Sequence, residues 1–187
     1  TQRYPSMEAV SARLDELYGA RLDPTVRKIG ESHVVGLAAS CVDDRFLSGE
    51  ERLLEPLADL MGEMLLRPAQ EDGGFVESYV DSERNNLVDL IESEINEKRA
   101  YASKRLIQEM CAGEPFGVSR LGAAAQAGAI TRADLDGHYR TVLPRARLEL
   151  FYCGSAPEER VAGAFTRAFA RLPRQGLLEP AATTRRS

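Results

Sequence analysis

The chain has 187 residues, of which 43% are hydrophobic and 28% charged, and its formal net charge is −5 at pH 7. This composition is that of a globular protein rather than a disordered one, and the length allows one ordinary domain with a proper core. No stretch approaches the roughly 20 apolar residues that a membrane helix requires. The negative charge argues against a nucleic-acid partner, because binding a phosphate backbone needs a concentrated basic face.

The cysteines indicate a reducing compartment. Cys41, Cys111 and Cys153 are widely spaced and odd in number, which fits buried free thiols better than a disulfide framework. The first five residues have none of the organisation of a signal peptide. We therefore expect a cytoplasmic protein.

Signals in the first third of the chain predict a helix, a hairpin and a second helix. Ser6 is a good N-cap and Gly19 is a common helix stop, with apolar residues at helical spacing between them. Residues 21–29 and 33–42 mix β-branched and polar residues around a glycine-containing turn, which predicts an antiparallel hairpin. The next helix is expected over residues 50–67, and Pro68 ends it.

The middle of the chain is dominated by an acidic segment with helical periodicity. It covers residues 75–111 without a proline, so it predicts either one very long helix or two helices with a bend near Asn96. The sequence Gly113-Glu114-Pro115-Phe116-Gly117 then breaks the pattern. The Gly/Ala-rich residues 122–129 predict a loop, with a helical turn as an alternative for part of it.

The last third predicts helix, strand and helix. Thr131 and Asp134 form a capping pair that opens a short helix, and residues 147–153 alternate as a strand. Pro157 is expected at the first position of the last helix, and residues 173–187 are expected to form a flexible tail. The order of elements predicts an α+β fold with helices packed on one face of an antiparallel or mixed sheet.

The two histidines do not predict a metal site. His33 begins a predicted strand and His138 lies in a predicted helix, with no second histidine beside either. A zinc hydrolase normally supplies three protein ligands and leaves one position for water. No cysteine has a histidine base close to it in the sequence, as a cysteine nucleophile would require. We therefore interpret these side chains as ordinary structural residues.

The acidic segment also has an ordinary explanation, which is a solvated helix face with ion pairs four residues apart, such as Glu94 with Lys98. Its acidic residues are Glu77, Asp81, Glu83, Asp89, Glu92, Glu94 and Glu97.

This segment and its surroundings resemble the M16 family of zinc peptidases, the pitrilysin and insulinase type. The resemblance is strongest to bacterial peptidase-like members that occur as sibling pairs, and its order and spacing hold over most of residues 4–172. The matching segments are Tyr4-Pro5-Ser6, residues 14–20, 65–68, 75–84 and 114–117 with Leu121-Gly122, and then residues 130–139 and 148–154.

The resemblance implies that the zinc site is degenerate. Active members carry an HxxEH motif shortly before the segment matched by Tyr4-Pro5-Ser6, so this chain is expected to be a fragment that starts after it. The family's third ligand is a glutamate seven residues after a supporting glutamate. Glu83 matches the supporting glutamate, and Leu90 occupies the ligand position. Asp89 could replace that ligand only if the helix register rotated by about 100°.

The resemblance also implies an architecture and partners. Residues 1–130 would be the remainder of an N-terminal domain and residues 131–172 a domain junction, in one half of a two-lobed module of the LuxS/MPP type. The expected partner is a sibling M16-like subunit, as in a dimer, or a second half of the same chain. A peptide or protein substrate could dock by strand addition, and an exposed sheet edge would favour self-association. No cofactor is expected in this chain, although active relatives hold zinc.

Three functional hypotheses remain open at this point. In the first, the protein is bacterial and catalytically inactive, and it is a structural or substrate-holding partner of a zinc peptidase. In the second, the chain is part of an active zinc-dependent metalloendopeptidase whose metal motif lies upstream or on a sibling subunit. In the third, it is an unrelated α+β interaction domain.

Overall fold

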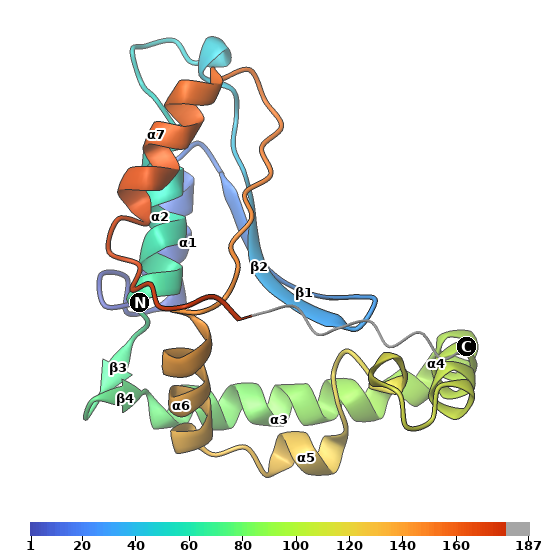
Figure 1. Ribbon diagram of the computed structural model, residues 1–187. Helices are drawn as coiled ribbons and strands as arrows, with labels where there is room; N and C mark the ends of the chain where they lie inside the picture. Colours follow the sequence, from blue (N-terminus) through green and yellow to red (C-terminus); the bar gives the residue numbers. More distant parts are fainter. Residues whose placement is uncertain (179–187) are drawn as a thin grey trace. The chain divides into compact units, whose positions relative to one another are not determined.

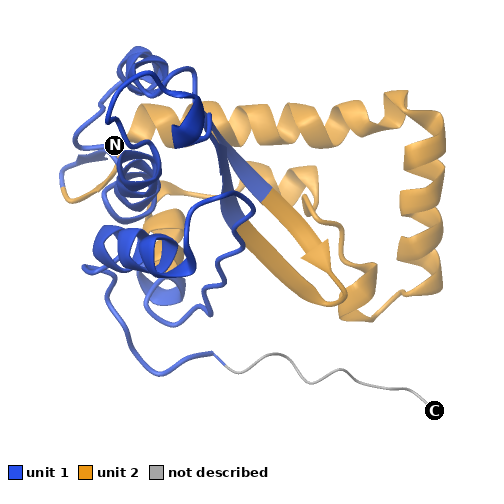
Figure 2. Ribbon diagram, turned by 90° about the horizontal axis from the view of Figure 1, so that it is seen from above, with its two compact units in different colours: residues 1–25, 36–72, 140–178 blue, residues 26–35, 73–139, 179–187 orange. Residues whose placement is uncertain are grey.

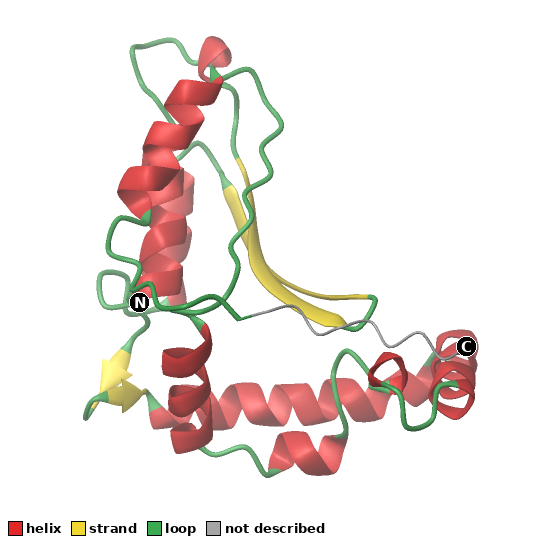
Figure 3. Ribbon diagram, viewed as in Figure 1, coloured by secondary structure: helices red, strands yellow, loops and turns green. Residues whose placement is uncertain are grey.

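The computed structural model describes residues 1–178, which form two compact units (Figure 2). Unit 1 comprises residues 1–25, 36–72 and 140–178, and unit 2 comprises residues 26–35 and 73–139 among those described. Helices and short two-stranded sheets follow one another along the chain (Figure 3), so the predicted α+β class is confirmed. The predicted division at residues 130 and 172 follows from the family resemblance and stays a prediction.

The first helix of unit 1, α1 (Met7–Glu16), begins and ends where its sequence predicts. The Ser6 side chain accepts a hydrogen bond from the Ala9 N–H at 3.2 Å, as an N-cap does. At the other end Gly19 has a φ of 70°, and its N–H donates to the Leu14 carbonyl at 3.1 Å. This left-handed ending pairs a carbonyl that the helix would otherwise leave open.

The predicted hairpin is confirmed. It consists of β1 (Arg21–Ile29) and β2 (Ser32–Ser40), which pair with each other (Figure 1). Gly30 in the turn has a φ of 59°, a conformation that favours glycine. The base of the hairpin belongs to unit 1 and its tip, residues 26–35, belongs to unit 2.

The core of unit 1 lies around α2 (Leu54–Leu66), which packs against α7 (Glu158–Ala168). The helix α2 begins four residues later than predicted, and the N–H of Leu53 before it donates to the Asp44 carboxylate at 3.0 Å. Asp44 itself opens a short 3-10 helix, η1 (Asp44–Phe46). The buried cluster consists of Leu17, Ala20, Leu53, Leu57 and Leu60.

Small residues allow α2 and α7 to approach closely. A Cβ added at Gly62 of α2 would lie 2.6 Å from the carbonyl oxygen of Ala168 in α7 and 3.1 Å from its carbonyl carbon. Ala58 of α2 and Ala164 of α7 are also buried. Any larger residue at position 62 would therefore force the two helix backbones apart.

An arginine-centred ion cluster ties α7 to η1 and to the first turn of α2. The Arg160 guanidinium donates to both carboxylate oxygens of Glu55 at 2.7 and 2.6 Å, and to Asp44 at 2.5 Å. Their side chains are only 15–31% exposed. The hydrogen bonds from Arg160 lower the pKa of Glu55 from 4.5 to about 2, and those to Glu55 and Asp44 raise the pKa of Arg160.

In unit 2 the acidic segment forms two helices, so the alternative of one continuous helix over residues 75–111 is wrong. The helices are α3 (Glu77–Ser93) and α4 (Lys98–Met110), separated by a 3-10 turn, η2 (Glu94–Asn96). The break falls at Glu97, whose φ of −89° and ψ of 77° lie outside the helical region. No glycine or proline marks this position, and the apolar periodicity continues across it.

Shorter elements complete unit 2. The helix α5 (Ala124–Gly128) packs against α3 with Ala127 buried. The helix α6 (Arg132–Val142) begins in unit 2, and its residues 140–142 belong to unit 1. It opens with the predicted pair, because the Asp134 N–H donates to Thr131 Oγ1 at 3.2 Å and the Thr131 N–H donates to Asp134 at 3.0 Å. The remaining elements are η3 (Pro115–Gly117) in unit 2 and the short paired strands β3 (Gln70–Glu71) and β4 (Gly74–Phe75).

The strand predicted over residues 147–153 is not present. The segment runs as loop, and neither sheet of the described residues includes it. Its alternation of apolar and polar residues is real, but a strand also needs a neighbour that pairs with its backbone. Phe151 is 92% exposed. Pro157 is the N-cap of α7 rather than its first helical residue.

The predicted tail is partly described. The Gln175 N–H donates to the Pro144 carbonyl at 3.0 Å, and the Leu178 N–H to the Arg145 carbonyl at 2.9 Å. The rest of the predicted tail, residues 179–187, lies outside the described residues. Within residues 1–178, none of the helices has the length and apolar character that crossing a bilayer demands.

Candidate functional site

The helix α3 carries Glu83 and Leu90, the two residues for which the resemblance to M16 peptidases predicts a supporting and a ligand position. Glu83 and Leu90 are seven residues apart, which places them about 20° apart around the helix axis. Both side chains are exposed, and Leu90 is 51% exposed. The face of α3 that holds these two residues therefore presents one carboxylate and one aliphatic side chain.

Asp89 does not replace the missing carboxylate on this face. The helix α3 is uninterrupted from Glu77 to Ser93, so the register shift that would bring Asp89 onto the Glu83 face is absent. Asp89 lies about 100° around the axis from Leu90. Its side chain is exposed to solvent.

The other candidate ligands are dispersed. His33 lies in β2 and His138 in α6, and both are exposed. Within residues 1–178, no three His, Cys, Asp or Glu side chains are grouped so that they could hold a metal ion. Cys41 and Cys153 are exposed and Cys111 is partly buried, so the expectation of three buried thiols is wrong, although all three are free.

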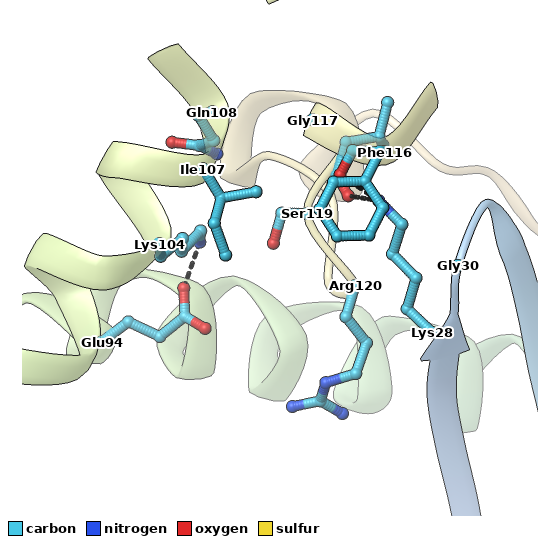
Figure 4. Close-up of a pocket in the computed structure, with 11 residues that line it drawn as sticks. Lys28, Gly30, Glu94, Lys104, Ile107, Gln108, Phe116, Gly117, Ser119 and Arg120 are labelled. Atoms are coloured by element: carbon cyan, nitrogen blue, oxygen red, sulfur yellow. Dashed lines mark hydrogen bonds and ion pairs between the residues drawn. The ribbon is translucent and has the colours of Figure 1, made fainter. Parts of the chain in front are cut away.

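Unit 2 contains a cavity that the sequence did not indicate. Its volume is about 280 Å³, and it is bounded by the hairpin tip, the η2 turn, one face of α4 and the loop that includes η3 (Figure 4). The side chains of Ile107 and Phe116 lie on either side of the space, with Ser119 between them (Figure 4). Its lining residues are Lys28, Gly30, Glu94, Lys104, Ile107, Gln108, Phe116, Gly117, Val118, Ser119 and Arg120.

Lys28 organises the loop wall of this cavity. Its ammonium donates to the carbonyls of Pro115 and Phe116 at 2.9 and 2.6 Å, and also to that of Val118. It lies 5.3 Å from the centre of the Phe116 ring, within cation–π range. The loop thus turns carbonyl oxygens toward a cation, which is the opposite of a phosphate-binding loop and its inward N–H groups.

Sequence reasoning missed this arrangement because its parts are distant in the chain. Lys28 meets carbonyls 87 to 90 residues away. The local sequence of a hairpin does not show whether a lysine donates hydrogen bonds to a distant loop or points into water. The glycine and proline residues of the loop do predict a turn, but they do not predict that Lys28 binds its carbonyls.

Replacing Lys28 with methionine is expected to loosen this loop. The substitution keeps an unbranched stem but removes the charged donor of three carbonyls. A hydrogen bond to a charged group contributes about 1.5–3 kcal/mol net to stability. We expect the Gly117, Val118 and Gly122 amides, which are bonded within the loop, to exchange with solvent at least about tenfold faster. Native-state hydrogen exchange measures this effect.

The matched control is Lys98→Met at the start of α4, where the lysine is exposed and outside the cavity lining. It should leave the loop amides unchanged. Equal acceleration in both variants would show that the loop responds to net charge rather than to the Lys28 contacts.

Comparison with known proteins places this chain near metalloprotease-like proteins. No family model matches the sequence. The chain is 29% identical over 169 residues to a protein of Bacillus subtilis (strain 168) described as probable inactive metalloprotease YmfF. The alignment covers 90% of this chain and 40% of the relative, so the chain spans about two fifths of the length of the curated relative it matches.

A solved structure shares the fold. The crystal structure of a conserved protein from Enterococcus faecalis V583 superposes with a TM-score of 0.81 and 24% sequence identity. The match covers 97% of this chain and 44% of that chain. This likeness supports the α+β arrangement.

Proposed function

We propose that this chain is part of a catalytically inactive M16-type peptidase-like protein that acts as a structural or substrate-holding partner of a zinc peptidase. The observation that carries the proposal is Leu90. Its helix is regular, and the resemblance matches its position to the one at which active M16 peptidases need a carboxylate. A hydrocarbon side chain has no lone pair to offer a metal ion.

The neighbouring side chains do not supply the missing metal ligand. Asp89 faces about 100° away around α3, and none of the histidines, cysteines or carboxylates of residues 1–178 forms a group that could hold zinc. The residues present thus do not fit the metal, and no catalytic step is assigned to them. The description of the Bacillus relative as an inactive metalloprotease supports the same conclusion.

The partner role is supported by the exposed apolar side chains of unit 2. Leu90 is 51% exposed and Ile95 is 48% exposed, both on the segment from α3 to η2. On α4, Leu106 is 58% and Met110 is 74% exposed. Apolar side chains on a helical surface are suited to contact with another subunit or with another part of a longer chain. The partner we propose is a sibling M16-like subunit or a second half of the same chain.

Titration with zinc tests the inactive character. Calorimetry on the chain is expected to show no stoichiometric binding of micromolar or better affinity, because α3 offers a single carboxylate on the relevant face. A Cys41→Ser, Cys153→Ser double variant identifies any zinc held by the exposed thiols. The outcome that sinks the proposal is stoichiometric zinc binding that survives in this variant and is removed by Glu83→Gln with Asp89→Asn. That result would favour an active metalloendopeptidase.

A further inference from the structure

The cavity of unit 2 carries an excess of positive charge. Three of its lining residues are cations, namely Lys28, Lys104 and Arg120, and a single one, Glu94, is an anion. Lys104 pairs with Glu94. The whole chain has a net charge of −5, so this local excess runs against the average of the molecule. It favours an anionic ligand over a neutral or cationic one.

The hydrogen-bond donors show where that ligand would be held. The Lys28 ammonium donates to three loop carbonyls and has no further proton to offer. Arg120 differs, because one of its guanidinium nitrogens donates to the Val26 carbonyl at 3.3 Å. No carboxylate of residues 1–178 forms an ion pair with it. A guanidinium has five N–H donors in a planar fork that matches the two oxygens of a carboxylate.

Apolar side chains line the same cavity as these donors. Ile107 is 42% exposed, Phe116 is 44% exposed and Val118 is 63% exposed, although all three line the cavity. A ligand that covered them would gain about 25 cal/mol for each Å² of apolar surface removed from water. The volume of about 280 Å³ is near the lower end for ligand pockets and limits the ligand to one apolar group plus its charge.

We propose that this cavity binds a carboxylate that adjoins an apolar group, with Arg120 as the carboxylate-binding residue and Ile107 and Phe116 as walls for the apolar group. Two sources present this chemistry, namely a small free carboxylic acid and the C-terminus of a peptide that ends in an apolar residue. This binding site does not depend on zinc, so its test is independent of the proposal that the protein is an inactive peptidase.

Nuclear magnetic resonance titration of the chain with two probe pairs tests the proposal. The first pair is 3-phenylpropionate and 3-phenylpropionamide, and the second is N-acetyl-Ala-Ala-Phe with a free carboxylate and the same peptide as its amide. We expect at least one carboxylate probe to shift the amide signals of residues 104–108 and 116–120 saturably. Its amide counterpart should bind at least tenfold more weakly. The probe that binds identifies the source of the ligand.

Three variants assign the interaction to Arg120. Arg120→Ala is expected to weaken binding of the carboxylate probe at least tenfold. Arg120→Lys, which keeps the charge but loses the planar fork, should fall between it and the wild type. The control is Arg99→Ala, which removes the same charge from an exposed position of α4 outside the cavity lining. It should bind as the wild type does.

The proposal is overturned if neither carboxylate binds saturably, or if the amides bind as tightly as the carboxylates. It is also overturned if Arg120→Ala and Arg99→Ala weaken binding equally, since that would indicate general charge attraction. Circular dichroism of each variant confirms that α4 and the other helices are intact. Because Arg120 is exposed, its replacement is not expected to unfold the chain.

Discussion

Arg160→Ala is expected to lower the free energy of unfolding by about 2 kcal/mol, between the 0–1 kcal/mol of an exposed ion pair and the 3–5 kcal/mol of a broken buried one. The expected loss of stability lies between these limits because the cluster is partly buried, with side chains that are 15–31% exposed. The substitution removes three charge-assisted hydrogen bonds. Glu55 loses its guanidinium partner, and Asp44 keeps only its longer ion pair with Arg52 at 3.8 Å. Urea denaturation followed by circular dichroism measures the change.

The control for this prediction is Arg147→Ala. Arg147 also forms an ion pair, with Glu149 at 3.0 Å, but both side chains are 74% exposed. Its removal should therefore change stability by at most about 0.5 kcal/mol. If the two variants were equally stable, Arg160 would be a surface ion pair like the other, and the cluster would not hold α7 in place.

The same cluster predicts a dependence on pH. The folded-state pKa of Glu55 is lowered from 4.5 to about 2 by the Arg160 hydrogen bonds. Its contribution is therefore fully present above pH 4.5 and is lost as the pH falls toward 2. The loss of stability between pH 5 and pH 3 should be shallower in Arg160→Ala than in the wild type. Equal slopes would contradict the ionised pair.

Gly62→Ala is expected to destabilise the chain by about 2 kcal/mol, within the range of 1–3 kcal/mol for overpacking. The expected effect is opposite to the usual one, because replacing a glycine within a helix by alanine usually stabilises a protein by about 0.5–1 kcal/mol. The added methyl would lie 2.6 Å from the Ala168 carbonyl oxygen. That atom belongs to the backbone of α7, so the contact can be relieved only by moving a whole helix.

Gly163→Ala supplies the matched control on α7 itself. The nearest atom to its added Cβ is the end of the flexible Arg167 side chain, at 3.4 Å. This variant should be more stable than the wild type by about 0.5–1 kcal/mol. Thermal or urea unfolding of both variants measures whether each substitution raises or lowers the free energy of unfolding. A stabilised Gly62→Ala protein would mean that α2 and α7 do not approach as closely as described.

The features predicted well from the sequence are those specified by neighbouring residues. The Ser6 cap, the Gly19 ending of α1 and the reciprocal bonds of Thr131 with Asp134 all lie within a few residues of their partners. The hairpin likewise needs only a turn and two suitable flanks. Such signals can be read without knowing the rest of the structure.

The features that sequence reasoning missed depend on distant contacts or on backbone torsions. The segment 147–153 has the alternation of a strand, but alternation does not supply the pairing partner. The apolar spacing across Glu97 is helical and does not report its non-helical ψ. The cavity of unit 2 joins Lys28 to carbonyls some 90 residues away, and Gly62 is explained only by Ala168.

The division of the chain between its two units has a consequence for how it folds and how it can be cut. The backbone passes from one unit to the other after residues 25, 35, 72 and 139. Unit 1 is thus assembled from three separate pieces, and its last piece must return across the whole of residues 73–139 before the core can close, at an entropic cost that grows slowly with that length. A single nick at any of these passages leaves the units tethered, so neither can be released as a fragment by one cleavage.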